Sequence, residues 1–450
     1  MKYSDIPSTT VLLQYPILQE LEHPFSLRIV QLTTERIRGL IRRNQAIIPI
    51  QWEKELQYSK HLLQKKRYQR VINATGIVIH TNLGRSPLSE EVLDYVQHIS
   101  AGYCDLEMNM KTAKRGGRIL GIREKLQLLT GAEDALVVNN NAAAIFLVLT
   151  ALCKQKEVII SRSELVEIGG SFRVPDMISD GGALLREVGT TNRTHLRDYQ
   201  EAISENTAAI LKVHPSNFTI SGFVTKPSRA RLAKAARENN ILFVEDLGSG
   251  LLYPNPSLES SVFEEESLIQ ALQDGVDVLT FSGDKLLGAG QAGIILGKKE
   301  LIAQCRQHPL YRVLRLGKIS LAILEASLQI YLEGRADQLP IWEMMHRPLE
   351  KIREMAEEIA QEFSAAIIDT TVSYSGGGAL PEQNIPSLGV MIATNNAESM
   401  ARYLRGFHTP ILARIQQEKV IIDPRTLFPR DIPVVKEALR GWYNLSKIEE

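Results

Sequence analysis

Short runs of apolar residues recur through the middle of the chain, and stretches of helical character such as 226–240 separate most of them. Strands that alternate with helices are typical of βαβ units, so the pattern predicts a mostly parallel sheet with flanking helices. The last two runs lie close together, which predicts an antiparallel hairpin at the edge of the sheet. The runs are 135–139, 158–161, 183–189, 208–214, 241–246, 276–282 and 292–297.

The two ends of the chain follow other patterns. In residues 1–70, leucine and isoleucine recur at helical spacing, which predicts a small helical domain. From about residue 331 a further helix precedes a second set of short strands at 388–393, 411–415 and 419–423, with helical stretches at 397–406 and 433–442. We therefore expect three domains: a helical domain (1–70), a large α/β domain (71–330) and a smaller C-terminal α/β domain (331–450).

Composition places the chain among ordinary soluble proteins. It has 450 residues, of which 44% are hydrophobic and 23% are charged, and roughly 100–200 residues per domain fits two to four domains. No apolar run approaches the ~18 residues that span a bilayer, and the N-terminus has no secretory pattern. The three scattered cysteines fit a reducing compartment and argue against a thiol metal site. We expect a cytoplasmic protein without a metal, a membrane partner or a DNA partner.

Charge is distributed unevenly along the chain. Lys and Arg together number 52, as do Asp and Glu. Residues 1–70 hold twelve basic residues against six acidic ones, so this segment carries +6 and the remainder −6. A basic end on a neutral protein is typical of a site for a polyanion such as RNA, and equally of a solvated helical face.

Polar residues follow several of the predicted strands at their carboxyl ends, where open α/β sheets bind ligands. Ser282, Asp284 and Lys285 follow one run, Asp246 ends another, and His214 ends a third. The first run leads into Asn139, Asn140 and Asn141, and then into three alanines, Ala142 to Ala144, that should open a helix.

This set suits pyridoxal 5′-phosphate, which needs a lysine for a Schiff base, a carboxylate at its pyridine nitrogen and a helix N-terminus for its phosphate. Lys285 and Asp246 would supply the first two. Backbone N–H groups from Asn140, Asn141, Ala142 and Ala143 and the Ser282 hydroxyl would hold the phosphate, and His214 and Glu164 complete the candidate cofactor contacts.

Each of these residues also has an ordinary structural explanation. An aspartate after a strand is often a helix cap, a lysine in a glycine-rich loop is often solvated, and His214 could satisfy a buried hydrogen bond. The ordered set is typical of fold-type I pyridoxal enzymes. The chain lacks a Walker A motif, because GAGQAG is not followed by Gly-Lys-Ser/Thr, and it lacks a dinucleotide fingerprint after the first strand.

The chain resembles the bacterial selenocysteine synthase family, the L-seryl-tRNA(Sec) selenium transferases, over about residues 5–445. The resemblance implies a cytoplasmic fold-type I pyridoxal enzyme that forms a homo-oligomer of dimers, such as a decamer, with a tRNA-binding N-terminal domain. Four short stretches depart from the family's pattern, at 119–121, 162–165, 288–293 and 315–318. The motifs are VINATGIVIHTNLGRSPL (71–88), RGGR (115–118), LTGAEDALVVNNNAAA (129–144), ELVEIGGSFRVPD (164–176), VGTTNRT (188–194), KVHPSNF (212–218), EDLGSG (245–250), SGDKLLG (282–288) and HPLYRVLR (308–315).

The resemblance also implies roles for particular residues. Lys285 matches the Schiff-base lysine, Asp284 the neighbouring active-site acid and Asp246 the partner of the pyridinium nitrogen. Three arginines, Arg85, Arg312 and Arg315, match positions near the selenium donor, although Arg312 and Arg315 could instead form a solvated helical stripe. Because Arg85 lies far from Lys285 in sequence, in a loop with Gly84 and Pro87, we expect it to reach the Lys285 of a partner chain.

The function that follows is conversion of L-seryl-tRNA(Sec) to L-selenocysteinyl-tRNA(Sec) with selenophosphate, through β-elimination to an aminoacrylyl-tRNA and addition of selenium. One alternative is a pyridoxal lyase or transferase that acts on a small, phosphorylated amino acid. The other is a tRNA-binding homologue without selenium transfer.

Overall fold

The computed structural model divides into two compact units, residues 1–70 and 71–450, which are described separately. No helix in the described part of the chain is long and apolar enough to cross a membrane. The described residues are 3–43, 50–64, 68–168, 172–214, 218, 220–253, 267–361, 363, 365–377, 384–394 and 396–449.

A seven-stranded sheet forms the centre of the larger unit, in the order β5-β13-β12-β11-β10-β6-β9. Each apolar run of the sequence forms one strand, and only β13 runs antiparallel to its neighbours. The expected β12–β13 hairpin is present, but β13 lies between β12 and β5 and not at the edge, because it is buried along its whole length and pairs on both sides. The strands are β5 (Asp134–Val138), β6 (Glu157–Ser161), β9 (Leu184–Val188), β10 (Thr207–Val213), β11 (Leu242–Gly248), β12 (Val278–Ser282) and β13 (Gly293–Gly297).

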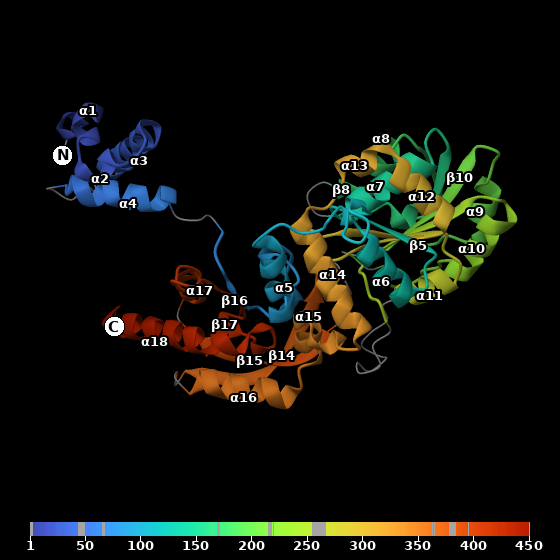
Figure 1. Cartoon of the computed structure of the whole chain (residues 1–450). Helices are drawn as coiled ribbons and strands as arrows, with labels where there is room; N and C mark the ends of the chain where they lie inside the picture. Colours follow the sequence, from blue (N-terminus) through green and yellow to red (C-terminus); the bar gives the residue numbers. More distant parts are fainter. Residues whose placement is uncertain are drawn as a thin grey trace. The chain divides into compact units, whose positions relative to one another are not determined.

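Helices cover both faces of this sheet (Figure 1). Successive side chains of a strand point to opposite faces, so Ala135 and Val137 pack into one apolar core while Leu136 and Val138 pack into the other. The first core includes α5 (Glu90–Ser100), α6 (Leu120–Thr130), α10 (Arg229–Glu238), α11 (Leu268–Gln273), α14 (Lys318–Leu332) and α15 (Pro340–His346). The second includes α7 (Asn141–Leu152), α8 (Val174–Asp180), α12 (Lys299–Gln307) and α13 (Pro309–Val313).

A six-stranded sheet with the order β1-β16-β17-β15-β14-β2 forms the C-terminal part. Helices α16 (Leu349–Ala360), α17 (Ala397–Arg405) and α18 (Ile432–Glu449) pack on it through a third apolar core. Two short strands near residue 75 join this sheet, although the sequence analysis assigned them to the large domain, because their partners lie about 300 residues later. The strands are β1 (Ile72–Ala74), β2 (Ile77–Ile79), β14 (Ala366–Gly376), β15 (Asn384–Ala393), β16 (Ile411–Gln416) and β17 (Lys419–Ile422).

The N-terminal unit consists of short and long helices around a small core of five buried side chains, which are Leu12, Leu18, Ile29, Val30 and Leu56. The hydroxyl groups of Thr33 and Ser59, 2.7 Å apart, join its two longest helices. The outer positions of the longest helix expose several arginines to solvent. The helices are α1 (Thr9–Leu13), α2 (Pro16–Gln19), α3 (His23–Arg42) and α4 (Trp52–Gln64).

The start of β13 passes directly under the turn that follows β5. A Cβ atom at Gly293 would overlap the carbonyl of Asn140 and lie 2.9 Å from the nitrogen of Asn141. Only glycine permits this approach, so Gly293 fixes where the turn and the following helix α7 begin.

We expect Gly293→Ala to lower the free energy of unfolding by about 1–3 kcal/mol, because the added methyl group must displace the Asn140 turn. Urea unfolding monitored by circular dichroism measures the change. Gly102→Ala is the matched control, since an added Cβ there meets no atom within 4 Å. Equal stabilities of the two variants would contradict the packing argument.

Candidate active site

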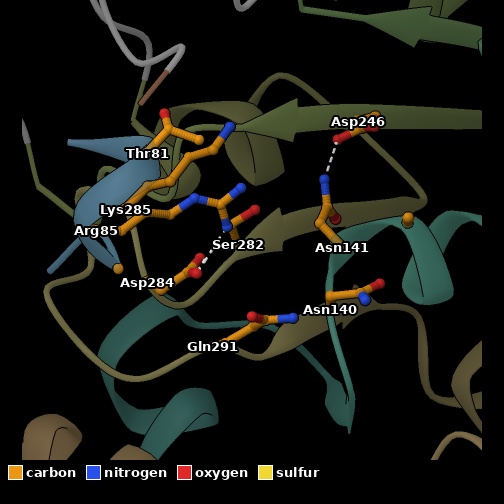
Figure 2. Close-up of a pocket in the computed structure, with 11 residues that line it drawn as sticks. Thr81, Arg85, Asn140, Asn141, Asp246, Ser282, Asp284, Lys285 and Gln291 are labelled. Atoms are coloured by element: carbon orange, nitrogen blue, oxygen red, sulfur yellow. Dashed lines mark hydrogen bonds and ion pairs between the residues drawn. The ribbon is translucent and has the colours of Figure 1, made fainter. Parts of the chain in front are cut away.

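The carboxyl ends of β11 and β12 meet the turn after β5 at a pocket of about 390 Å³, within the ~300–1,000 Å³ range of small-molecule sites. Figure 2 shows two separate contacts in this pocket, Asn141 with Asp246 and Arg85 with Asp284. The lining residues are Thr81, Gly84, Arg85, Asn140, Asn141, Ala142, Asp246, Ser282, Asp284, Lys285 and Gln291.

Helix α7 begins at the pocket and presents its first N–H groups there. Asn140 is the N-cap, and its side-chain oxygen accepts a hydrogen bond from the backbone N–H of Ala143 at 2.8 Å. That bond occupies the N–H of Ala143, so Ala143 is not available as the phosphate donor that the sequence predicts. The N–H groups of Asn141 and Ala142 have no acceptor within the helix, because the first turn of a helix offers none. These two groups form a cradle for a phosphate.

Asp246 is buried at the end of β11. Its carboxylate accepts a hydrogen bond from the Asn141 side-chain amide at 2.7 Å. Burial raises the pKa of Asp246 to about 6, although the bond from Asn141 and the charge of Lys285 act in the opposite direction. A buried carboxylate in this state gains stability from any cationic N–H group that enters the pocket.

The neighbouring carboxylate, Glu245, is satisfied from within the protein. It receives hydrogen bonds from Lys212 at 2.6 Å and from the Arg229 Nε at 2.5 Å, and all three side chains are buried or nearly so. Burial raises the pKa of Glu245, but the two cations more than offset this effect and hold it below its usual value. Glu245 therefore belongs to a structural ion-pair cluster. Asp246 is the carboxylate that faces the pocket.

Lys285 lies three residues beyond β12, in a loop that hydrogen bonds from another segment hold in place. The Ser86 hydroxyl donates to the carbonyls of Asp284 and Lys285, each at 3.0 Å. The Lys285 side chain is 7% exposed and reaches the same pocket as Asp246. An aldehyde bound in this pocket would therefore meet the Lys285 amine.

Arg85 forms an ion pair with Asp284 of its own chain, with 2.7 Å between Nη1 and Oδ2. This differs from the expectation that Arg85 reaches a partner chain. Gly84 and Arg85 both have positive φ angles, of 90° and 64°, so the backbone turns back towards β12 and carries the guanidinium into its own pocket.

Four predicted site residues lie outside the pocket lining. Glu164 is buried and accepts a hydrogen bond from the Val213 N–H at 3.2 Å, and burial raises its pKa to about 7. His214 follows β10, and its N–H donates to the Asp246 carbonyl at 2.9 Å, so it supports the strand that carries Asp246.

Arg312 is exposed on α13, and Arg315 is half-buried, with its guanidinium 5.7 Å from the Tyr311 ring. The backbone of Leu314 accepts a hydrogen bond from Asn139 at 3.1 Å, which anchors this segment beside the Asn140 turn. The structure thus brings Arg315 near the phosphate cradle without placing it in the pocket lining.

The pocket also includes Thr81, Gly84 and Gln291, which the sequence analysis did not select as site residues. Thr81 and Gly84 lie in the same short motif as Arg85, and Gln291 lies in the glycine-rich run after Lys285. Both motifs were visible in the sequence, so proximity to a selected residue was the signal that could have identified them.

The residues present fit pyridoxal phosphate. The two N–H groups of α7, the Asp246 carboxylate and the Lys285 amine are the three kinds of group that the cofactor requires. In addition, the side-chain oxygen of Asn141 is buried without a hydrogen-bond partner in the described structure, so it can accept a bond from a ligand. The described residues contain no cluster of His, Cys, Asp or Glu suited to a metal ion.

Comparison with known proteins gives consistent matches. Residues 71–428 match the model of the family described as L-seryl-tRNA selenium transferase. The L-seryl-tRNA(Sec) selenium transferase of Aquifex aeolicus is 44% identical over 385 residues, which cover 84% of this chain and 85% of that protein. The protein of the same name from Aliarcobacter butzleri is 39% identical over 449 residues, which cover 98% and 99%.

A solved structure, that of D-glucosaminate-6-phosphate ammonia-lyase, matches with a TM-score of 0.61 and 23% identity. The match covers 83% of this chain and 95% of that one. Together with the strand order, it confirms the expected fold class, that of the fold-type I pyridoxal-phosphate transferases.

We expect the affinity for pyridoxal phosphate to fall about tenfold for each pH unit below 6, because protonation of Asp246 removes the charge that attracts the ring nitrogen. The sign follows from the raised pKa: the carboxylate is present above pH 6 and is lost below it. Absorbance titrations between pH 5 and 8 measure the affinity.

Asp246→Asn is the control for this prediction. It should bind the cofactor more weakly at pH 7.5 and lose the additional dependence on pH. An identical slope in both proteins would assign the dependence to the cofactor's own phosphate.

Proposed function

The chain belongs to the L-seryl-tRNA selenium transferase family, and on this premise we propose that it converts L-seryl-tRNA(Sec) to L-selenocysteinyl-tRNA(Sec) with selenophosphate as the selenium donor. The family expected from the motifs is thereby confirmed, and pyridoxal 5′-phosphate is the cofactor. The observation that carries the proposal is the meeting of Lys285, Asp246 and the α7 N-terminus in one pocket.

When bound, pyridoxal phosphate supplies an electron sink for the electron pair left at the seryl α-carbon. Asp246 keeps the ring nitrogen protonated, and its hydrogen bond from Asn141 fixes the direction of the carboxylate. The N–H groups of Asn141 and Ala142 hold the phosphate at the opposite end. These groups would hold the cofactor from two sides before the substrate arrives.

Lys285 moves the protons of the reaction. Its Nζ amine takes the α-proton from the seryl group, and it returns a proton to the same carbon after the β-substituent has been exchanged. Only 7% of Lys285 is exposed to solvent, which limits the water that would otherwise compete for the proton.

The Arg85–Asp284 pair suits the exchange at the β-carbon. Arg85 has five N–H donors, of which one contacts Asp284, so the others remain for an oxyanion. The proposal gives Asp284 the role of assisting departure of the β-hydroxyl group. The proposal gives Arg312 and Arg315 a supporting role in anion binding, and family resemblance alone supports that part.

Three finer statements belong to the same proposal. The chain acts in the cytoplasm, it assembles as a homo-oligomer of dimers, and its basic N-terminal unit contacts the tRNA. The net charge of +6 in residues 1–70 and the exposed arginines of α3 support the last of these.

The deciding experiment supplies the purified, cofactor-loaded protein with seryl-tRNA(Sec) and selenophosphate. We expect selenocysteinyl-tRNA(Sec), and we expect Lys285→Ala to reduce the rate by at least about a thousandfold, because it removes the proton carrier. Borohydride reduction followed by peptide mapping should attach the cofactor to Lys285. Attachment at another lysine would overturn the assignment, and failure to convert the substrate would overturn the function.

Removal of residues 1–70 should weaken tRNA binding by at least about a hundredfold, since the phosphate contacts of this basic unit are lost. The visible absorbance of the bound cofactor should be unchanged, because residues 71–450 form a separate compact unit. Filter binding measures the affinity. A truncated protein that binds tRNA as the full chain does would refute the role of this unit.

A further inference from the structure

A second hollow of about 390 Å³ lies between the start of α9 (Leu196–Ala202) and the start of α10. Four basic side chains line it, and no acidic residue does: the four are His195, Arg197, Lys226 and Arg231. A concave surface lined by one sign of charge concentrates ions of the opposite sign. This lining favours an anion over a cation.

The positive charge of this hollow is only partly neutralised. Arg197 has a carboxylate oxygen of Asp198 at 3.7 Å, and the other oxygen of Asp198 accepts the His195 backbone N–H. Lys226 and Arg231 are exposed and form no ion pair with any residue that the structure describes. Two full positive charges thus remain for a ligand.

An exposed aromatic ring lies beside the same segment. Phe223 is 82% exposed, and the Arg193 guanidinium lies 5.7 Å from the centre of its ring. The Asn192 side-chain amide donates to the Phe223 carbonyl at 2.8 Å, and Arg193 pairs with Thr225 as an isolated β-bridge. The ring is therefore held at the surface next to the basic hollow, where it offers a face on which a nucleic-acid base can stack.

The hollow lies on the same edge of the sheet as the active site. Residues 193–197 follow the carboxyl end of β9, which is three strands from β11 and hence about 15 Å across the sheet. The segment after β10 connects the two places, because the backbone N–H of His214 bonds to the Asp246 carbonyl and Lys226, twelve residues later, lines the hollow.

We propose that this hollow binds the unpaired 3′ end of the RNA substrate, with a phosphodiester at Lys226 and Arg231 and a base on Phe223. The inference rests on the proposed function, because a seryl ester on a 3′ end must be brought to Lys285 from outside. A small anion or an acidic peptide would account for the basic residues alone. A nucleic acid also accounts for the exposed Phe223 ring, because its phosphates and its nucleobases would engage both features.

The test measures the affinity of the holoenzyme for seryl-tRNA(Sec) and for the same tRNA shortened by its unpaired 3′ nucleotides. For the intact tRNA we expect Lys226→Ala/Arg231→Ala to raise Kd about tenfold and to reduce the salt slope by about 0.7, the value for loss of one single-strand phosphate contact. The shortened tRNA should bind both proteins alike. Phe223→Leu should raise Kd several-fold for the intact tRNA alone.

Lys234→Ala is the matched control, because Lys234 lies on the same helix, pairs with Glu238 at 3.7 Å and does not line the hollow. Unchanged affinity in the double variant, or equal weakening for both tRNAs, would overturn the inference. The inference would also fail if the double variant bound the tRNA normally and differed only in that inorganic phosphate no longer competed with the tRNA. The hollow would then be a site for a small anion. A wild-type protein that binds the tRNA but converts none of it would instead refute the proposed function.

Discussion

The burial of the Asp246 carboxylate is the constraint on which the site depends. Its hydrogen bond from Asn141 joins the end of β11 to the first turn of α7, so the residues at the two ends of the expected cofactor are positioned by one contact. That turn is in turn fixed by the glycine of β13 that passes beneath it. The order of the strands therefore determines where α7 begins, and the start of α7 determines the position of the Asp246 carboxylate.

Two adjacent acids on β11 show how the fold separates structure from chemistry. Glu245 points to one face and is compensated by a lysine and an arginine of the protein. Asp246 points to the other and receives one neutral amide hydrogen bond. Their pKa values move in opposite directions for this reason. The sequence alone, with Glu-Asp in a buried strand, could not have assigned these different roles.

Much of the fold was predictable because buried strands read as continuous apolar runs, and the seven strands of the large sheet follow those runs closely. The residues directly after the strands, such as Asp246 and Lys285, were predictable for the same reason. The position of β13 within the sheet was not predictable, since β13 pairs with β5, which lies far away in the sequence. Nor was the association of β1 and β2 with the C-terminal sheet, because three-residue strands carry too little pattern. The contact of Arg85 with Asp284 depends on two left-handed residues, which no apolar periodicity reveals.

The contact between Arg85 and Asp284 also sets a threshold for anions. Asp284 competes with external anions for the Arg85 guanidinium, and it has a high effective concentration because it belongs to the same chain. A weakly bound monovalent ion such as chloride gains little by displacing it. An oxyanion with several charged oxygens can engage the remaining N–H groups while the carboxylate stays in place. The ion pair therefore disfavours chloride relative to an oxyanion at Arg85.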